Sequence, residues 1–365
     1  MNRYRQHLNQ HLLQCWILLL LVLLGGAIAA NEDTLDLGAR IQSPPLTARH
    51  AEPDFHVWCG APIKGLDGRY HLFYSRWLVT AGFTAWVTRS EIAHAVADDP
   101  MGPYVFADVS LPARGAGFWD GSATHAPSIM IKDGRYCLFY LGNRGNGEFW
   151  SHRNQQRIGV AIAERPEGPW TRLDQPIIDV SNEPMAFDSL MVNCPAAFLR
   201  PDGRIQIIYK AVGKVPGKTN GGKVRHGVAL ADRPEGPYSK EGLAFANLET
   251  GGHWMVAENI FGWYSRLAQR YYALTRDPAA VLTGSKNGVA LLTSVDGFTW
   301  TKAAHPQVLG SRFTWADGTA SVYPVERPAL LFEGDEPIVL FGATDGYQVK
   351  RRTSCNVRFP LKSAP

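Results

Sequence analysis

The chain has 365 residues, of which 37 are lysine or arginine and 33 are aspartate or glutamate, so its formal net charge is +4 at pH 7. The charges are interspersed, and this excludes a strongly basic surface of the kind that binds nucleic acid or an anionic membrane. A chain of this length forms one large domain or two ordinary ones.

The first thirty residues have the pattern of a secretory signal peptide. Arg3 and Arg5 make a basic start, residues 16–24 form an apolar stretch, and Ala27-Ile28-Ala29 is a small-x-small cleavage pattern. The apolar stretch is much shorter than the ~20 residues of a membrane-spanning helix, which makes a membrane anchor the less favoured alternative. We therefore expect residues 1–30 to be removed, the mature chain to be secreted or periplasmic with no membrane contact, and its formal charge to fall to +2.

The cysteines indicate neither a zinc site nor a disulfide framework. Cys15 leaves with the signal peptide, and the other four stand far apart with no CxxC spacing. An oxidising compartment permits disulfides, and four cysteines allow three connectivities. Most of the four lie in apolar, strand-like segments, where cysteine packs as a small buried side chain. They are Cys59, Cys137, Cys194 and Cys355.

An internal repeat is the strongest feature of the sequence. Three copies of one proline- and glycine-containing turn recur with a period of roughly 62 to 68 residues, each after a short apolar strand, and a looser fourth copy follows. The three turns are Asp99 to Tyr104, Arg165 to Trp170 and Arg233 to Tyr238.

A second element alternates with these turns and has the form of a β-hairpin. A proline-led strand is followed by an Asp-Gly turn, which favours a two-residue hairpin loop, and then by an aromatic strand. Two further copies have lost the turn sequence. The five hairpins are Pro62 to Tyr74, Pro127 to Tyr140, Pro195 to Tyr209, Ile260 to Thr275 and Pro328 to Thr344.

Hairpin, third strand, turn and fourth strand together make the four-stranded unit of a propeller blade, whereas a β-sandwich would not repeat such a unit. We therefore predict an all-β fold, a five-bladed β-propeller of four-stranded antiparallel blades around a central channel. It should occupy residues 45–359 as a single domain, after an N-terminal extension at 31–44. The last strand, within residues 350–359, should pair near the first blade and close the ring.

The inner strands of a propeller converge on the channel, and each unit carries a carboxylate close to its inner strand. Such acids could simply cap turns or form structural ion pairs. Carboxylates facing one channel repel, however, unless a proton, a cation or a substrate offsets their charge. The candidates are Asp54, Asp120, Asp188, Glu258 and Glu326.

This arrangement resembles the five-bladed propeller glycosidases of the arabinanase, levansucrase and invertase superfamily, and most of all the family 43 glycoside hydrolases. The resemblance implies hydrolysis of a glycosidic bond in an oligo- or polysaccharide, with inversion, by an ionised and a protonated carboxyl group. It assigns Asp54 as general base, Glu258 as general acid and Asp188 as the residue that orients the acid and adjusts its pKa. The family's first-blade Asp usually stands immediately before a proline, whereas Asp54 follows Pro53, so Asp120 is the substitute base.

Other residues near the predicted channel are candidates for substrate binding. Trp58 and Trp119 could stack on sugar rings or pack between blades. His125 lies two residues before Pro127 and aligns with Gly60, Asn193 and Glu326, so it should face the channel as a structural histidine or, as in some propeller glycosidases, as the acid or the ligand of a central ion. Glu326-Arg327 is either a structural ion pair or a substrate clamp. No cofactor is required, although a structural Ca²⁺ near His125 would suit converging oxygen ligands.

Two alternatives stay open at this stage. A glycoside phosphorylase would need a basic phosphate cradle, for which Lys210, Lys214, Arg157 and Arg225 are available, and secretion disfavours it. A non-catalytic carbohydrate-binding propeller would bind sugar without turnover. The sugar, the linkage and internal or terminal cleavage depend on loops such as 142–156 and 211–223, and no sequence pattern indicates an oligomeric state.

Overall fold

The computed structural model of the protein describes residues 33–249, 251–321, 323–345 and 354–363, which belong to one compact unit that begins at Asp33. The predicted signal peptide and residues 350–353 of the predicted closing segment lie outside the described residues. Within those residues, no helix has the length and apolar character to cross a membrane.

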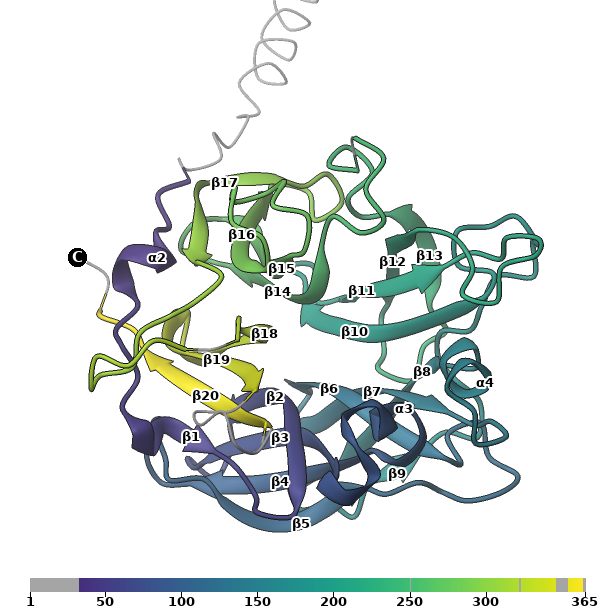
Figure 1. Cartoon of the computed structure of the whole chain (residues 1–365), viewed down its shortest axis with the longest axis horizontal. Helices are drawn as coiled ribbons and strands as arrows, with labels where there is room; N and C mark the ends of the chain where they lie inside the picture. The colour runs from purple at the N-terminus through teal and green to yellow at the C-terminus, as the bar shows by residue number, and fades with distance from the viewer. Residues whose placement is uncertain (1–32, 250, 322, 346–353, 364–365) are drawn as a thin grey trace, which may run out of the picture. The chain divides into compact units, whose positions relative to one another are not determined.

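Twenty strands in the described part of the chain form five four-stranded antiparallel sheets arranged in a ring (Figure 1). The predicted five-bladed propeller is thus confirmed. The first blade consists of β2 (Phe55–Lys64), β3 (Tyr70–Leu78), β4 (Glu91–Ala97) and β5 (Val105–Leu111), and the second of β6 (Ala123–Lys132), β7 (Arg135–Asn143), β8 (Arg157–Ala163) and β9 (Thr171–Arg172). The third consists of β10 (Met191–Leu199), β11 (Ile205–Val212), β12 (Val224–Ala231) and β13 (Ser239–Leu243), and the fourth of β14 (Glu258–Ser265), β15 (Arg270–Asp277), β16 (Gly288–Ser294) and β17 (Thr301–Leu309). The fifth consists of β18 (Glu326–Glu333), β19 (Glu336–Asp345), β20 (Ser354–Pro360) and β1 (Arg49–His50).

The repeated turn shapes the outer half of the first three blades. Each copy contains a glycine with positive φ, namely Gly102 at 86°, Gly168 at 92° and Gly236 at 87°, before a cis proline. A Cβ atom on Gly102 would lie 2.9 Å from the backbone nitrogen of Tyr104, so the turn excludes a side chain there. This requirement explains why Gly-Pro recurs in the sequence.

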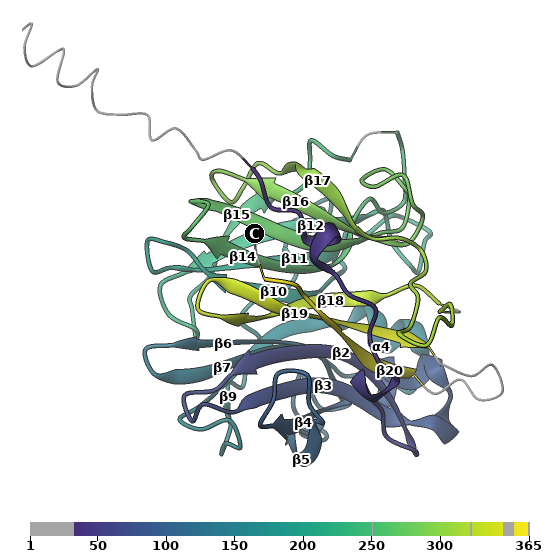
Figure 2. The ribbon, with the colours of Figure 1, turned by 90° about the vertical axis from the view of Figure 1, so that its left-hand side faces the viewer.

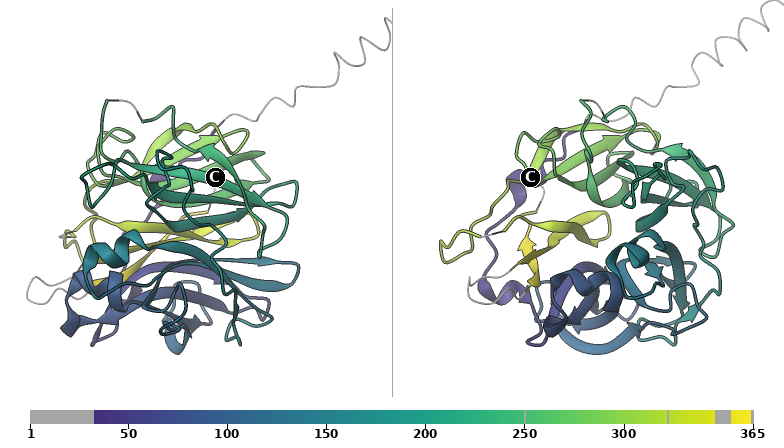
Figure 3. Two further views of the ribbon diagram at one scale, coloured as in Figure 1. Left: turned by 90° about the vertical axis from the view of Figure 1, so that its right-hand side faces the viewer. Right: turned by 45° about the vertical axis from the view of Figure 1, so that its right-hand side comes forward.

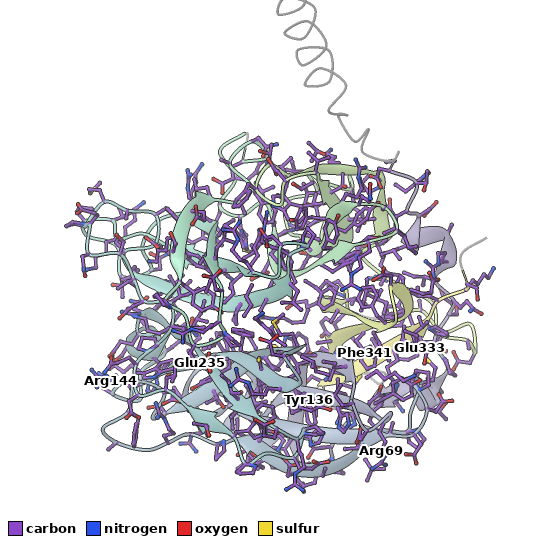
Figure 4. The ribbon with its side chains drawn as sticks, turned by 180° about the vertical axis from the view of Figure 1, so that it is seen from behind. Arg69, Tyr136, Arg144, Glu235, Glu333 and Phe341 are labelled. Atoms are coloured by element: carbon purple, nitrogen blue, oxygen red, sulfur yellow. The ribbon has the colours of Figure 1, made fainter. Side chains whose placement is uncertain are left out.

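Apolar side chains fill the space between neighbouring blades (Figure 4). Between the fourth and fifth blades, for example, Leu274 and Leu291 pack with Leu340 and Phe359. Strands buried on both faces explain the continuous apolar sequences of the hairpins. The four described cysteines are buried and free.

Both ends of the described chain build the fifth blade. Residues 49–50 pair with β20 as its outermost strand, and the segment before them runs along the outside of the fourth and fifth blades (Figure 2). The predicted closing strand is therefore the third strand of the fifth blade, and the N-terminal β1 completes that blade. The predicted extension is also packed against the propeller, because Asp33 accepts a hydrogen bond from Tyr272 and Arg40 donates to the carbonyl of Pro337.

The inner strand of every blade contains a β-bulge at the same position. A residue with φ between 50° and 61° marks each bulge: Cys59, Ala126, Cys194, Asn259 and Arg327. The residues immediately before them, which we call the bulge ring, are Trp58, His125, Asn193, Glu258 and Glu326. The counterpart of His125 in the first blade is thus Trp58 and not Gly60, because alignment on Pro62 misplaced the first bulge by two residues.

Candidate active site

Two members of the bulge ring are carboxylates that share a cation. Glu258 accepts hydrogen bonds from Lys210 Nζ at 2.8 Å and from Arg276 Nη1 at 2.5 Å. The same Arg276 nitrogen lies 3.3 Å from Glu326 Oε1. Lys210 and Arg276 stand on the second strands of their blades, directly opposite Asn193 and Glu258 in the strand register.

The surroundings of the two carboxyl groups push their pKa values apart. Burial raises the pKa of Glu258, but Lys210, Arg276 and Arg327 outweigh burial and lower that pKa to about 2. Burial also raises the pKa of Glu326, the charge of Glu258 adds to the effect, and the neighbouring cations do not outweigh it. Of the pair, Glu326 is therefore the group that more readily holds a proton.

The opposite side of the ring is polar but neutral. His125 Nδ1 is 2.8 Å from Ser90 Oγ, and its Nε2 is 3.4 Å from Cys59 Sγ. Burial, with a smaller effect of Arg327, holds the pKa of His125 well below its usual range. Asn193 donates a hydrogen bond to Gln156 Oε1 at 2.6 Å.

Two short helices, α3 (Trp86–Arg89) and α4 (Phe149–Asn154), lie side by side at the first two blades (Figure 3). Trp86 of α3 packs on the His125 ring with centroids 4.9 Å apart, and it contacts Phe149 of α4. Trp58 is 8% exposed and packs edge-on against Phe83. Trp58 thus belongs to an aromatic wall beside the ring rather than to an open stacking platform.

Below the ring, the bulge residues line a narrow part of the channel, which we call the throat. Its cavity of about 50 Å³ is bordered by Cys59, Cys194, Asn259 and Arg327, among others. Sulfur atoms are visible near the centre of the ring in Figure 4. A wider hollow of about 1090 Å³ follows at the far end of the inner strands, lined by Met130, Phe198 and Trp263, among others. No residue of the bulge ring borders that hollow, so it is not the site of the carboxylate chemistry.

The predicted site residues separate into two groups. Trp58, His125, Glu258, Glu326 and Arg327 come together at the bulges, as the sequence pattern indicated. The others do not join them, and they are Asp54, Asp120, Asp188 and Trp119.

Each residue of the second group has a different environment from the one predicted. Asp54 is exposed in the turn before β2, where its carbonyl accepts from Val79 N. Asp120 is buried and paired with Arg114 and Arg172, and Trp119 stacks on Tyr140. Asp188 contacts Tyr209 and Lys240, and it is not among the groups that shift the pKa of Glu258.

Sequence reasoning missed the residues that surround the two carboxylates. Lys210 had been considered only for a phosphate cradle, and Arg276, Asn193 and Ser90 had no assigned role. A signal for Lys210 and Arg276 existed, since each is the residue directly opposite a bulge-ring position across the hairpin.

The five-sheet ring and its inner bulges can be compared with known proteins. The chain aligns over 88% of its length, with a TM-score of 0.62 and 16% identity, to 90% of a family 117 glycoside hydrolase from the marine bacterium Zobellia galactanivorans. It aligns over 86% of its length, with a TM-score of 0.58 and 12% identity, to 96% of a thermostable family 43 glycoside hydrolase. This is the fold of the five-bladed glycosidases.

Two further comparisons bear on this glycosidase fold. A family 43 β-xylosidase/α-arabinofuranosidase from a compost metagenome, in complex with xylotriose, gives a TM-score of 0.54 at 13% identity over 87% of this chain and 98% of its own. In sequence, a xylosidase/arabinosidase of Humicola insolens is 37% identical over 59 residues, which is 16% of this chain and 16% of that protein. No protein-family model matches the chain. The predicted resemblance to propeller glycosidases is confirmed at the level of the fold.

Proposed function

We propose that the protein is a glycoside hydrolase in which Glu326 donates the proton and Glu258 is the ionised carboxylate. The observation that carries this proposal is the pair itself: two half-buried carboxyl groups on adjacent inner strands, bridged by Arg276, whose pKa values are shifted in opposite directions by their surroundings. Glycoside hydrolysis requires one carboxyl group of each kind.

The spacing of the pair supports retention of anomeric configuration. One Arg276 nitrogen contacts an oxygen of each carboxyl group, at 2.5 and 3.3 Å, so these oxygens lie within ~6 Å of each other. Retaining enzymes hold their carboxyl groups ~5 to 5.5 Å apart, and inverting enzymes ~6.5 to 9.5 Å apart. Retention is therefore part of the proposal for this pair, whereas the inversion implied by the family resemblance concerned a different pair, Asp54 and Glu258.

In the first step a Glu258 oxygen attacks the anomeric carbon while Glu326 gives its proton to the departing glycosidic oxygen. The sugar is then esterified to Glu258, and the leaving group departs as a neutral alcohol. In the second step Glu326 takes a proton from water as the water oxygen attacks the anomeric carbon, which releases the sugar and restores both carboxyl groups. Lys210 and Arg276 stabilise Glu258 as the leaving carboxylate.

The channel residues do not fit the structural Ca²⁺ that the sequence suggested. Lys210, Arg276 and Arg327 bring positive charge to the carboxylates that a cation would need, and both ring nitrogens of His125 face side-chain partners. No cluster of three or more potential metal ligands occurs among the described residues. Secretion remains a prediction from residues 1–30.

Loss of the proton donor and loss of the ionised carboxylate should affect turnover differently, depending on the leaving group. Glu326→Gln should lower turnover of unactivated glycosides by about 10²- to 10⁴-fold and spare nitrophenyl glycosides, which need little protonation. Glu258→Gln should abolish turnover of both classes, and the exposed Glu164→Gln is the matched control. NMR of the first product formed should show retained configuration. Wild-type protein that binds sugars without hydrolysing any of a broad glycoside panel would instead identify a carbohydrate-binding propeller.

A further inference from the structure

Arg327 is a half-buried cation that makes no ion pair with a carboxylate in the described chain, although its charge acts on Glu258 from a greater distance. Its one side-chain hydrogen bond runs from Nη1 to Cys194 Sγ at 3.0 Å, and its buried Nε has no partner. Three other arginines of the propeller, Arg76, Arg114 and Arg276, each contact two carboxylates.

A buried guanidinium nitrogen without a hydrogen-bond partner costs stability, and a ligand that accepts a hydrogen bond from it would recover that cost. Cys59, the other thiol of the throat, supplies no negative charge, because burial raises the pKa of Cys59 to about 12. Asn259 also reaches the throat with a side-chain oxygen that has no partner. An amide can turn about its last bond to present its NH₂ group to an anion.

The size of the throat limits what can reach Arg327. Its cavity of about 50 Å³ has room for a few water molecules or one small group, but not for a sugar ring. A sugar seated among the bulge-ring residues could extend one substituent into this cavity. A substituent that carries negative charge would meet Arg327 at the bottom of the site.

The charge around the carboxylate pair favours the same class of ligand. Three cations, Lys210, Arg276 and Arg327, surround Glu258 and Glu326. When Glu326 holds its catalytic proton, three positive charges face one negative charge. An anionic sugar offsets that excess, whereas a neutral sugar leaves it buried.

We propose that Arg327 binds an acidic substituent, a carboxylate or a sulfate, on the sugar that occupies the bulge ring, and so selects anionic carbohydrates such as uronic acids. This specificity rests on the proposed glycosidase function. The recognition itself is a binding property of the throat that is measurable without turnover.

The binding test uses glucuronate, galacturonate, inorganic sulfate and neutral glucose as probes, with calorimetry and melting temperature as readouts. We expect at least one uronate to bind wild-type protein about 10- to 100-fold more tightly than glucose, as befits hydrogen bonds to a charged group. Arg327→Met should remove that preference, whereas Arg327→Lys should restore part of it. Arg69→Met, at an exposed arginine paired with Asp98, is the control.

Three outcomes would overturn the proposal. Equal affinity for uronates and glucose shows that the throat does not distinguish charged from neutral sugars. Sulfate that binds as tightly as the uronates, and competes with neither them nor nitrophenyl uronides, shows an inorganic anion site unrelated to substrate. Fast alkylation of Cys194 at neutral pH, slowed by Arg327→Met and unaffected by uronates, shows that a Cys194 thiolate is the counter-ion.

Measurements of hydrolysis distinguish a failure of this inference from a failure of the proposed function. Hydrolysis of nitrophenyl uronides in preference to neutral nitrophenyl glycosides, lost in Arg327→Met, supports both. Hydrolysis of neutral glycosides alone, with no uronate binding, refutes the specificity and keeps the glycosidase function. Uronate binding that depends on Arg327 without hydrolysis of any glycoside keeps the recognition and refutes the glycosidase function.

Discussion

At the scale of single residues, the proposed chemistry lies at the positions before the bulges of the fourth and fifth blades, and residues opposite bulge-ring positions across the hairpins include the cations that act on Glu258. The five opposing residues differ widely in charge, and only two are cations. They are Ser75, Leu141, Lys210, Arg276 and Ala343. The sequence identified Glu258 and Glu326 because the repeat aligns them. The family resemblance assigned the proton to Glu258, whereas Lys210 and Arg276 lower the pKa of Glu258 and so favour Glu326 as the proton holder, an effect of neighbours that the repeat does not reveal.

Lys210→Met tests this electrostatic control. Removal of the cation should raise the pKa of Glu258 from about 2 towards the ordinary value, by about one unit. Activity needs ionised Glu258, so the acid limb of the kcat/KM profile should move to higher pH by a similar amount. Lys214→Met, at an exposed lysine, should leave the limb in place. An acid limb that does not move in Lys210→Met would mean that Glu258 is not the ionised group.

At the scale of elements, each of the first three blades contains a cluster of a tyrosine, a carboxylate and a cation. From the sequence alone, the carboxylates of the second and third blades were interpreted as catalytic residues. In each of the three blades, a tyrosine at the same position of the second strand donates to a carboxylate that precedes the blade, and a cation backs that carboxylate. The tyrosine–carboxylate pairs are Tyr74–Glu52, Tyr140–Asp120 and Tyr209–Asp188. The cations are Arg76, Arg114 with Arg172, and Lys240.

This cluster explains why Asp120 and Asp188 recur seven residues before a proline, each after an aromatic residue. A repeated carboxylate signals a repeated structural need as readily as a shared channel, and sequence spacing does not distinguish the two. The burial and the partners of Asp120 favour a structural role. The regular strands and turns were predictable because they depend on local sequence, whereas this distinction depends on contacts between segments.

Asp120→Asn separates stability from catalysis. The substitution leaves Arg114 and Arg172 facing a neutral amide in a buried site, and breaking a buried ion pair costs about 3 to 5 kcal/mol. The free energy of unfolding from denaturant titration should fall by that amount, with turnover per folded molecule close to wild type. Asp174→Asn, at the 81% exposed second partner of Arg114, should cost less than ~1 kcal/mol. Loss of turnover at unchanged stability would restore Asp120 as a catalytic candidate.

At the scale of the whole molecule, the ring is closed by contacts between segments far apart in sequence. The predicted number of blades was correct because five units fill the chain, but β1 has two residues and no periodicity that could reveal its pairing with β20. Arg358 of β20 is 1% exposed and lies at the contact between the fifth and first blades, which we call the seam. It donates to the carbonyls of Met101 in the first blade and Thr47 in the N-terminal segment, and it lies over the ring of Tyr104.

Arg358→Met should therefore weaken the seam between the first and fifth blades while it keeps most of the apolar contact. Two hydrogen bonds from a charged group are lost at about 1.5 to 3 kcal/mol each, and a lower melting temperature by roughly 5 to 10 °C is the expected result. Amide hydrogen exchange should accelerate first in β1 and β20, because the seam opens before the blades unfold. Arg312→Met, at an exposed arginine, is the control. Uniform acceleration in all five blades would show instead that the ring unfolds as one unit. In that case Arg358 does not specifically stabilise the contact between the first and fifth blades.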